Sequence, residues 1–142
     1  MKKLILVLAA LFAPVIVHAA DAVTISTQTL GSNRAIIAYT NISDGTGEAA
    51  VSKLTIAALQ GAPTKVRINK VWWITSGMDV RILFDHTTDD HVMTLSGYGE
   101  ADFSRFGGIK DPSSAGGTGN ILFTTVGHTA GDSYTVVIEV TY

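Results

Sequence analysis

The run Tyr134-Thr135-Val136-Val137-Ile138-Glu139-Val140-Thr141-Tyr142 decides the fold class. Its even-numbered residues are all aromatic or β-branched, and its odd-numbered residues are polar except Val137. Successive side chains of a β-strand point to opposite faces, so this period of two predicts a strand with one face in a core and the other toward solvent. The run is therefore expected to be a half-buried β-strand.

The same alternation recurs upstream and predicts further strands. The segment from 51 to 59 also contains helix-forming Ala and Leu, but the alternation of Leu54, Ile56 and Ala58 favours a strand. The expected strands are 23–30, 34–42, 51–59, 66–74, 80–84, 92–95 continuing toward Tyr98, 121–126 and 134–142. About eight short strands separated by turn residues are typical of a β-sandwich or jelly roll. We therefore expect an all-β fold of antiparallel strands, in one domain covering residues 20–142.

Gly-rich segments separate these strands. Ser76-Gly77 is expected to form a turn, and residues 127–132 are expected to form a hairpin loop between the last two strands. Residues 104–119 are the longest irregular stretch, with Gly107-Gly108 and Gly116-Gly117 among them. A loop of this length in a small domain usually binds a partner or packs at an interface.

Composition excludes several classes of protein. The 142 residues include no Cys, so disulfides, thiolate metal sites and cysteine nucleophiles are excluded. The formal net charge of -2 leaves no basic excess for binding nucleic acid. Only 15% of residues are charged, against about 25% in an average domain. A surface dominated by Thr, Ser and Gly favours an extracellular or assembled protein.

The first 19 residues resemble a secretory signal peptide. Lys2 and Lys3 precede an apolar run over 4–17, and Val17 and Ala19 fit the positions before a cleavage site. Cleavage after Ala19 would export the domain to the periplasm or the medium, with no membrane span left. The alternative is that the apolar run is retained as an arm of the protein. It is too short to be a membrane anchor, because a membrane-spanning helix needs ~20 residues.

One polar cluster could bind a metal ion. Residues 85–91 contain His86, His91 and three Asp side chains, all of which are potential ligands of Zn²⁺ or Ca²⁺. The spacing does not match an EF-hand loop, and two His residues five apart define no fixed geometry. We therefore favour a solvated connection in which Asp side chains accept local backbone hydrogen bonds.

No motif for catalysis or nucleotide binding is found. The run from Gly116 to Gly119 lacks the Lys and Ser/Thr that follow a phosphate-binding loop. No Ser lies in a nucleophile elbow that would recruit His86, His91 or His128. Glu48, Glu100 and Glu139 define no pair across a cleft. We expect a protein that is not an enzyme, and assign no catalytic, cofactor-binding or metal-binding residue.

Trp72 and Trp73 are adjacent, so in a strand they face opposite sides. One of them can enter the core. The other is expected on the outer face, where it packs under a loop, contacts a neighbouring subunit or offers a platform to a sugar ring. The sequence leaves open which Trp faces outward.

From about Val51 to Tyr142, two thirds of the chain, the sequence resembles small virion structural proteins of tailed phages of marine bacteria. The resemblance rests on Lys70-Val71-Trp72-Trp73, Gly77-Met78-Asp79-Val80-Arg81-Ile82-Leu83-Phe84-Asp85, Thr87-Thr88-Asp89-Asp90, Phe106-Gly107-Gly108-Ile109-Lys110-Asp111-Pro112, Gly116-Gly117-Thr118-Gly119-Asn120-Ile121-Leu122-Phe123-Thr124-Thr125 and Gly131-Asp132-Ser133-Tyr134-Thr135. It implies a non-enzymatic protein of the phage particle that decorates the capsid as a trimer, in contact with the capsid protein. It assigns no site residues.

Two functional readings follow. The resemblance predicts a protein of the virion. The leader instead predicts a protein outside the cytoplasm, so the second reading is a secreted or periplasmic β-sandwich that binds glycans or builds an extracellular assembly. Both readings include self-association. Three features favour self-association: few residues are charged, residues 121–126 are apolar on both faces of the expected strand, and one Trp has to leave the core.

Overall fold

The computed structural model describes residues 22–31, 33–112 and 116–142, which form an all-β domain. Ten strands and two short 3-10 turns make up this part of the chain. They are β1 (Ala22–Thr29), β2 (Arg34–Ile42), β3 (Val51–Leu54), η1 (Ile56–Ala58), β4 (Arg67–Ser76), β5 (Asp79–Phe84), β6 (Asp90–Leu95), β7 (Tyr98–Asp102), η2 (Ser104–Phe106), β8 (Ile109–Lys110), β9 (Ile121–Val126) and β10 (Ser133–Thr141). No helix in this part is long and apolar enough to cross a membrane.

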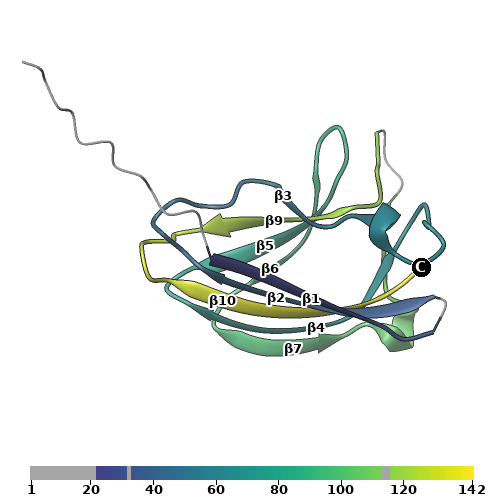
Figure 1. Cartoon of the computed structure of the whole chain (residues 1–142), viewed down its shortest axis with the longest axis horizontal. Coiled ribbons are helices and arrows are strands. Elements are labelled where there is room, and N and C mark those ends of the chain that lie inside the picture. The colour runs from purple at the N-terminus through teal and green to yellow at the C-terminus, as the bar shows by residue number, and fades with distance from the viewer. Residues whose placement is uncertain (1–21, 32, 113–115) are drawn as a thin grey trace, which may run out of the picture.

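The strands form two antiparallel sheets that pack face to face (Figure 1). The larger sheet has the order β1-β2-β10-β4-β7, with β8 also paired to β4, and the smaller has the order β3-β9-β5-β6. Apart from β1 and β8, the eight remaining strands have jelly-roll connectivity, in which the first strand pairs with the last and most connections pass from one sheet to the other. The expected sandwich of about eight antiparallel strands is confirmed, and β7 and β8 are further strands of the larger sheet that were not expected as separate elements.

The core lies between the sheets. Tyr134, Val136, Ile138 and Val140 on β10 are at most 2% exposed, as the alternation of the C-terminal run predicts. Three aromatic side chains form the centre: Phe123 lies edge-on to Tyr39, at 5.2 Å between ring centroids, and to Tyr134, at 5.9 Å. Edge-to-face pairs of this kind stabilise a core beyond the area that they bury.

The strand expected over 51–59 is only half correct. β3 ends at Leu54, and η1 follows. Ile56, the first residue of this turn, and Leu59, which follows it, are both buried, and the Ile56 amide donates to Asn120 Oδ1 at 3.1 Å. The apolar residues here are three apart, which suits a 3-10 turn. The apparent alternation of Leu54, Ile56 and Ala58 was therefore misleading.

Two connections differ from the expectation. The predicted strand after 92 stops at Leu95, because Gly97 turns the chain at φ 64° into β7, which belongs to the other sheet. Residues 127–132 do not form a hairpin, since β9 lies in the smaller sheet and β10 in the larger. This crossover is held by Ser43, which exchanges backbone hydrogen bonds with Gly131 and Asp132 at 2.8 Å.

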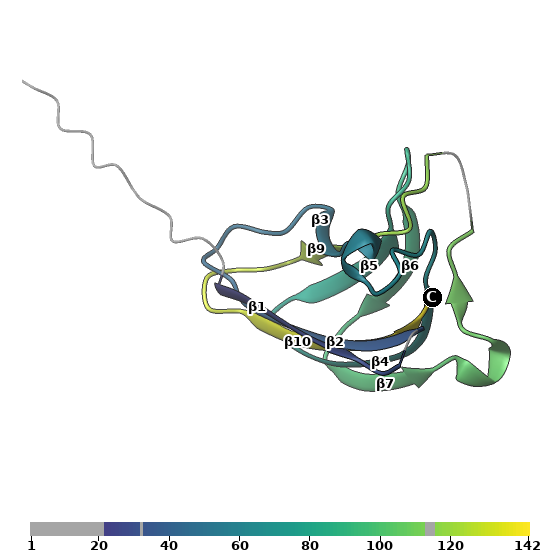
Figure 2. The ribbon, with the colours of Figure 1, turned by 45° about the vertical axis from the view of Figure 1, so that its right-hand side comes forward.

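The stretch 104–119 is less irregular than expected, because it contains η2 and the short strand β8. Figure 2 shows this segment at the edge of the sandwich beside the C-terminus. The leader expected over 1–19 lies outside the described residues. The strand 121–126 is apolar on both faces as expected, but Leu122 is only 5% exposed, so a single chain already covers it.

Candidate functional site

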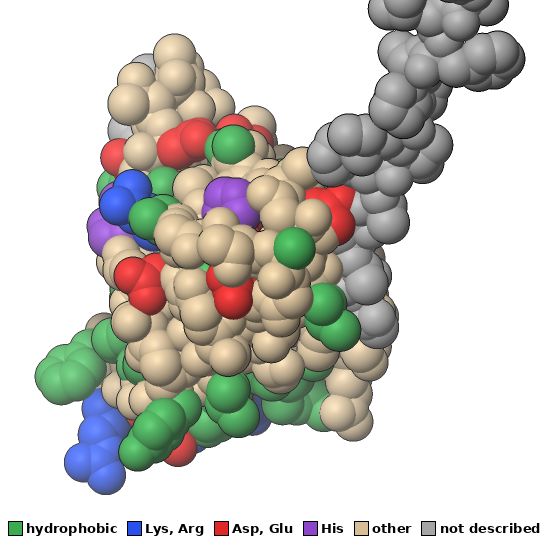
Figure 3. Space-filling view, turned by 90° about the vertical axis from the view of Figure 1, so that its left-hand side faces the viewer, with side chains coloured by type: hydrophobic (Ala, Val, Ile, Leu, Met, Phe, Trp, Pro, Cys, Tyr) green, Lys and Arg blue, Asp and Glu red, His purple; other side chains and the backbone are tan. Residues whose placement is uncertain are grey.

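The outer face of the larger sheet, the face turned away from the core, carries several exposed apolar side chains. Strand register fixes its rows: Trp72 lies between Val137 and Glu100, and Ile74 lies between Thr135 and Tyr98. We use "outer face" for the following side chains: Ile36, Ala38, Thr40, Ile42, Trp72, Ile74, Tyr98, Thr135 and Val137. In the end view of Figure 3, hydrophobic side chains gather along the lower border, where the larger sheet lies.

Trp72 is the tryptophan that faces outward. Trp73 pairs with the buried Val136, packs against the core and donates its indole N–H to the Ser96 carbonyl at 3.2 Å. Its ring leaves no room for a side chain at Gly99, where a Cβ would overlap it. The expectation that the pair splits between two faces is confirmed, and the alternation along β4 assigns Trp72 to the outer face.

Several large side chains on this face are open to solvent. Tyr98 is 86% exposed, Ile74 is 64% exposed and Ile42 is 57% exposed. Trp72 is half-buried among its neighbours. Contiguous apolar surface that includes aromatic side chains is a mark of an interaction site, whereas single exposed apolar residues are ordinary.

Ion pairs border the apolar rows at one end. Arg34 contacts Glu139 at 2.7 Å, and Lys70 contacts Asp102 at 3.0 Å while lying 6.0 Å from the Trp72 ring centre. The hydroxyl of Ser104, Lys70 and the Ser104 amide all donate to Asp102, which lowers its pKa to about 2. The pKa of Arg34 and that of Lys70 are raised by their carboxylate partners. This border therefore carries charges of both signs.

The cluster over 85–91 connects its own loop to residues 111–120 through hydrogen bonds and ion pairs. The His86 side chain is 1% exposed, and its Nε2 lies 2.8 Å from Asp111 Oδ1 and 3.5 Å from Asp90 Oδ2. Asp85 accepts hydrogen bonds from Thr118 at 2.6 Å and Asn120 at 3.3 Å. The expectation of a solvated connection is therefore wrong for His86. Among the described residues, no three His, Asp or Glu side chains are arranged to hold a metal ion.

The remaining candidate side chains lie in several parts of the fold, although Glu100 and Glu139 are both close enough to raise the pKa of Lys70. His91 is exposed and contacts Thr94 at 3.0 Å, whereas His128 lies 3.5 Å from Thr125 at the crossover between the sheets. Glu139 pairs with Arg34, and Glu100 is exposed beside Trp72. The two glycines at 116 and 119 have positive φ of 77° and 79°, which fits turns.

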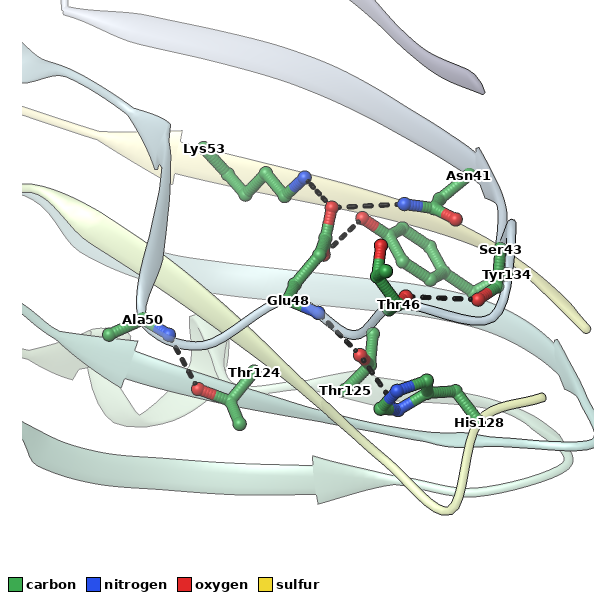
Figure 4. A network of polar contacts seen from close by, with 10 residues as sticks. All are labelled: Asn41, Ser43, Thr46, Glu48, Ala50, Lys53, Thr124, Thr125, His128 and Tyr134. Carbon is green, nitrogen blue, oxygen red and sulfur yellow. Dashed lines mark hydrogen bonds and ion pairs between the residues drawn. The ribbon is translucent and has the colours of Figure 1, made fainter. Parts of the chain in front are cut away.

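A buried network around Glu48 was missed by sequence reasoning (Figure 4). Glu48 forms an ion pair with Lys53 and accepts hydrogen bonds from Asn41 at 3.0 Å and from the Tyr134 hydroxyl at 2.9 Å. Its backbone exchanges hydrogen bonds with Thr125 at 2.8 and 3.0 Å. These partners come from both sheets, so no local spacing could reveal them, and the network fixes the segment that joins β2 to β3.

Comparisons with known proteins add little. No family model matches the chain, and no curated protein matches it. One similar solved structure is a mutant of a family 29 carbohydrate-binding module, described as a probe of ligand recognition by that family. The match has a TM-score of 0.36 and 14% identity, and covers 85% of this chain and 73% of the other. A TM-score this low carries no functional argument.

Proposed function

We propose that the chain is a non-enzymatic structural protein of a larger particle, of the virion-decorating kind that residues 51–142 resemble. The observation that supports this most strongly is the outer face, on which the exposed Ile74 and Tyr98 lie beside the half-buried Trp72. Jelly rolls recur in viral capsid and lectin domains, so the fold is compatible with this role but does not define it.

The positions of the polar side chains support a role without catalysis. His86 is enclosed and engaged by Asp111, and Glu48 is engaged by Lys53. Both groups join loops or strands that are distant in the sequence, which is a structural task. A catalytic acid or base has to reach its substrate through a cleft, and these two side chains are buried.

The occupant that we propose for the outer face is a second copy of the same chain. The border carries Arg34, Glu139, Lys70 and Asp102, so neighbouring copies around a symmetry axis can exchange ion pairs between the cations of one copy and the carboxylates of the next. The resemblance to virion proteins favours three copies, seated on the capsid protein. Burial of Trp72 and Tyr98 at the centre would provide the aromatic anchors that dominate binding energy in such interfaces.

The direct test is the composition of particles from the native source. If the proposal is correct, the protein migrates with intact particles through a density gradient, at a constant molar ratio to the major capsid protein. Quantitative mass spectrometry of the gradient fractions measures that ratio. Recovery of the protein only as a free component of the medium or periplasm would contradict the proposal.

A secreted glycan-binding module is the second candidate. Trp72 and Tyr98 are diagonal neighbours on adjacent strands, and exposed aromatic rings spaced in this way can stack on sugar rings. Affinity electrophoresis in gels that contain soluble polysaccharides distinguishes this candidate. It predicts that a polysaccharide retards the wild-type chain but not Trp72→Ala, whereas the structural proposal predicts no retardation of either.

A further inference from the structure

A groove of about 730 Å³ lies beyond the charged border of the outer face. It is formed where β4 begins, where β10 ends and beside β8, close to the C-terminus in Figure 2. The lining residues are Asn33, Pro63, Thr64, Lys65, Val66, Arg67, Lys110, Asp111, Thr141 and Tyr142. None of the interactions of the outer face uses this groove.

The groove is basic although the domain is acidic. Residues 20–142 contain eight Lys and Arg against twelve Asp and Glu, because Lys2 and Lys3 lie in the leader. Three of those eight, Lys65, Arg67 and Lys110, line this one groove. Its single acidic side chain, Asp111, is buried and bound to His86 at 2.8 Å. The local charge is thus opposite in sign to that of the domain.

Two of these cations lie directly opposite each other. The antiparallel pairing of β4 with β8 sets Arg67 against Lys110, and like charges in that arrangement destabilise a sheet. Both side chains are exposed, and neither forms an ion pair with another residue that the structure describes. A carboxylate bound between them would remove the repulsion.

Tyr142 also lines the groove, but its hydroxyl is buried and has no hydrogen-bond partner in the described part of the chain. A ligand in the groove therefore does not reach this hydroxyl, and the exposed cations are the groups that can bind it.

We propose that this groove binds an acidic peptide segment, whose carboxylates pair with Arg67 and Lys110. A guanidinium group matches the two oxygens of a carboxylate, and the lysines contribute further charge. A peptide fits better than an acidic polysaccharide because the one aromatic ring of the groove, Tyr142, is half-buried and offers no open platform for a sugar. The site is separate from the proposed assembly face.

The experiment measures binding of a fluorescein-labelled hexaglutamate peptide to the full chain by fluorescence anisotropy at low ionic strength. We expect saturable binding that weakens with added salt. The double variant Arg67→Gln/Lys110→Gln should weaken it by about tenfold or more, as expected for the loss of charged hydrogen bonds. The matched control is Arg81→Gln/Arg105→Gln, which removes the same charge from exposed positions outside the groove and should retain the wild-type affinity.

A third variant, Tyr142→Phe, removes only the buried hydroxyl and should leave both the affinity for the peptide and the unfolding midpoint unchanged. Unfolding midpoints of all variants are compared, so that loss of binding is read only from folded protein. Absence of peptide binding to the wild type, or equal affinities of the two double variants, would overturn the proposal. Binding of a sulfated oligosaccharide in place of the peptide would overturn it as well.

Discussion

Tyr39 and Tyr134 both contact Phe123 in the core, but their hydroxyl groups have different environments. The Tyr134 hydroxyl donates to Glu48 at 2.9 Å, whereas that of Tyr39 is buried without a partner in the described part of the chain. Burial raises the pKa of Tyr39 above its usual range, so the phenol stays neutral. We predict that Tyr134→Phe lowers the free energy of unfolding by about 1–3 kcal/mol, whereas Tyr39→Phe leaves it unchanged or raises it by up to ~1 kcal/mol. Urea denaturation measures both values, and equal losses would contradict the assignment.

The ion pair of Glu48 and Lys53 is buried, with side chains 5% and 2% exposed. Lys53→Met should lower the free energy of unfolding by about 3–5 kcal/mol, because it leaves the carboxylate without its cation. The double variant Glu48→Gln/Lys53→Met should recover part of that loss, since no net charge then remains in the network. A double-mutant cycle by urea denaturation checks this, and strictly additive losses would show that the two charges do not interact.

At the border of the outer face, the pKa of Asp102 is lowered from 3.8 to about 2 by the Ser104 hydroxyl, Lys70 and the Ser104 amide. A carboxyl group with a lowered folded-state pKa stabilises the fold above its unfolded pKa, and that contribution is lost as the pH falls through the folded value. The contribution of Asp102 should therefore be complete above about pH 4 and disappear toward pH 2. Ser104→Ala should raise the pKa of Asp102, which NMR titration of the carboxyl carbon measures, and an unchanged pKa would contradict the assigned cause.

At the scale of one element, the two tryptophans of β4 lie on opposite faces of the sheet and should contribute differently to stability. Trp73→Ala should lower the free energy of unfolding by about 2–3 kcal/mol, because the ring packs against the core. Trp72→Ala should change it by less than ~1 kcal/mol, because Trp72 lies on the outer face. Thermal unfolding monitored by circular dichroism compares the two variants. A larger loss for Trp72→Ala would contradict the assignment of faces.

The same strand shows how far sequence reasoning reached. Alternation predicted β2, β4, β5 and β10, because each has one face against the core and consecutive residues therefore alternate in burial. The run of apolar and Thr residues predicted β9. Alternation failed at η1, where Leu54, Ile56 and Ala58 alternate as they would in a strand, and at β7, whose apolar and polar residues alternate little and which lies at a sheet edge. It also mistook the crossover after β9 for a hairpin, because turn residues alone do not reveal which sheet the next strand joins.

At the scale of the whole molecule, the candidate surfaces could not be predicted because they combine strands that are distant in the sequence. The outer face joins residues of β2, β4, β7 and β10, and the basic groove joins β4, β8 and the end of β10. The sequence predicted one outward Trp but neither its neighbours nor their rows. The network around Glu48 likewise depends on packing between the two sheets.

The two functional readings also differ in the first residue of the native protein. Export with cleavage after Ala19 predicts a chain that begins at Ala20, whereas the virion reading predicts a chain that retains the leader. The intact mass of the protein from its native source distinguishes them. A mass that starts at Met1 or Lys2 would remove the secreted reading and strengthen the virion one, whereas a mass that starts at Ala20 would favour the secreted module.

Self-association through the outer face is the central claim, and sedimentation velocity of residues 20–142 tests it most directly. At micromolar concentration we predict a trimer for the wild type and a folded monomer for Trp72→Ala/Ile74→Ser, since an aromatic anchor at an interface centre contributes about 2 kcal/mol or more. The control Val51→Ser, which removes an exposed apolar side chain from the smaller sheet, should remain a trimer. A wild-type chain that sediments as a monomer, or a Trp72→Ala/Ile74→Ser variant that assembles as the wild type does, would contradict the account.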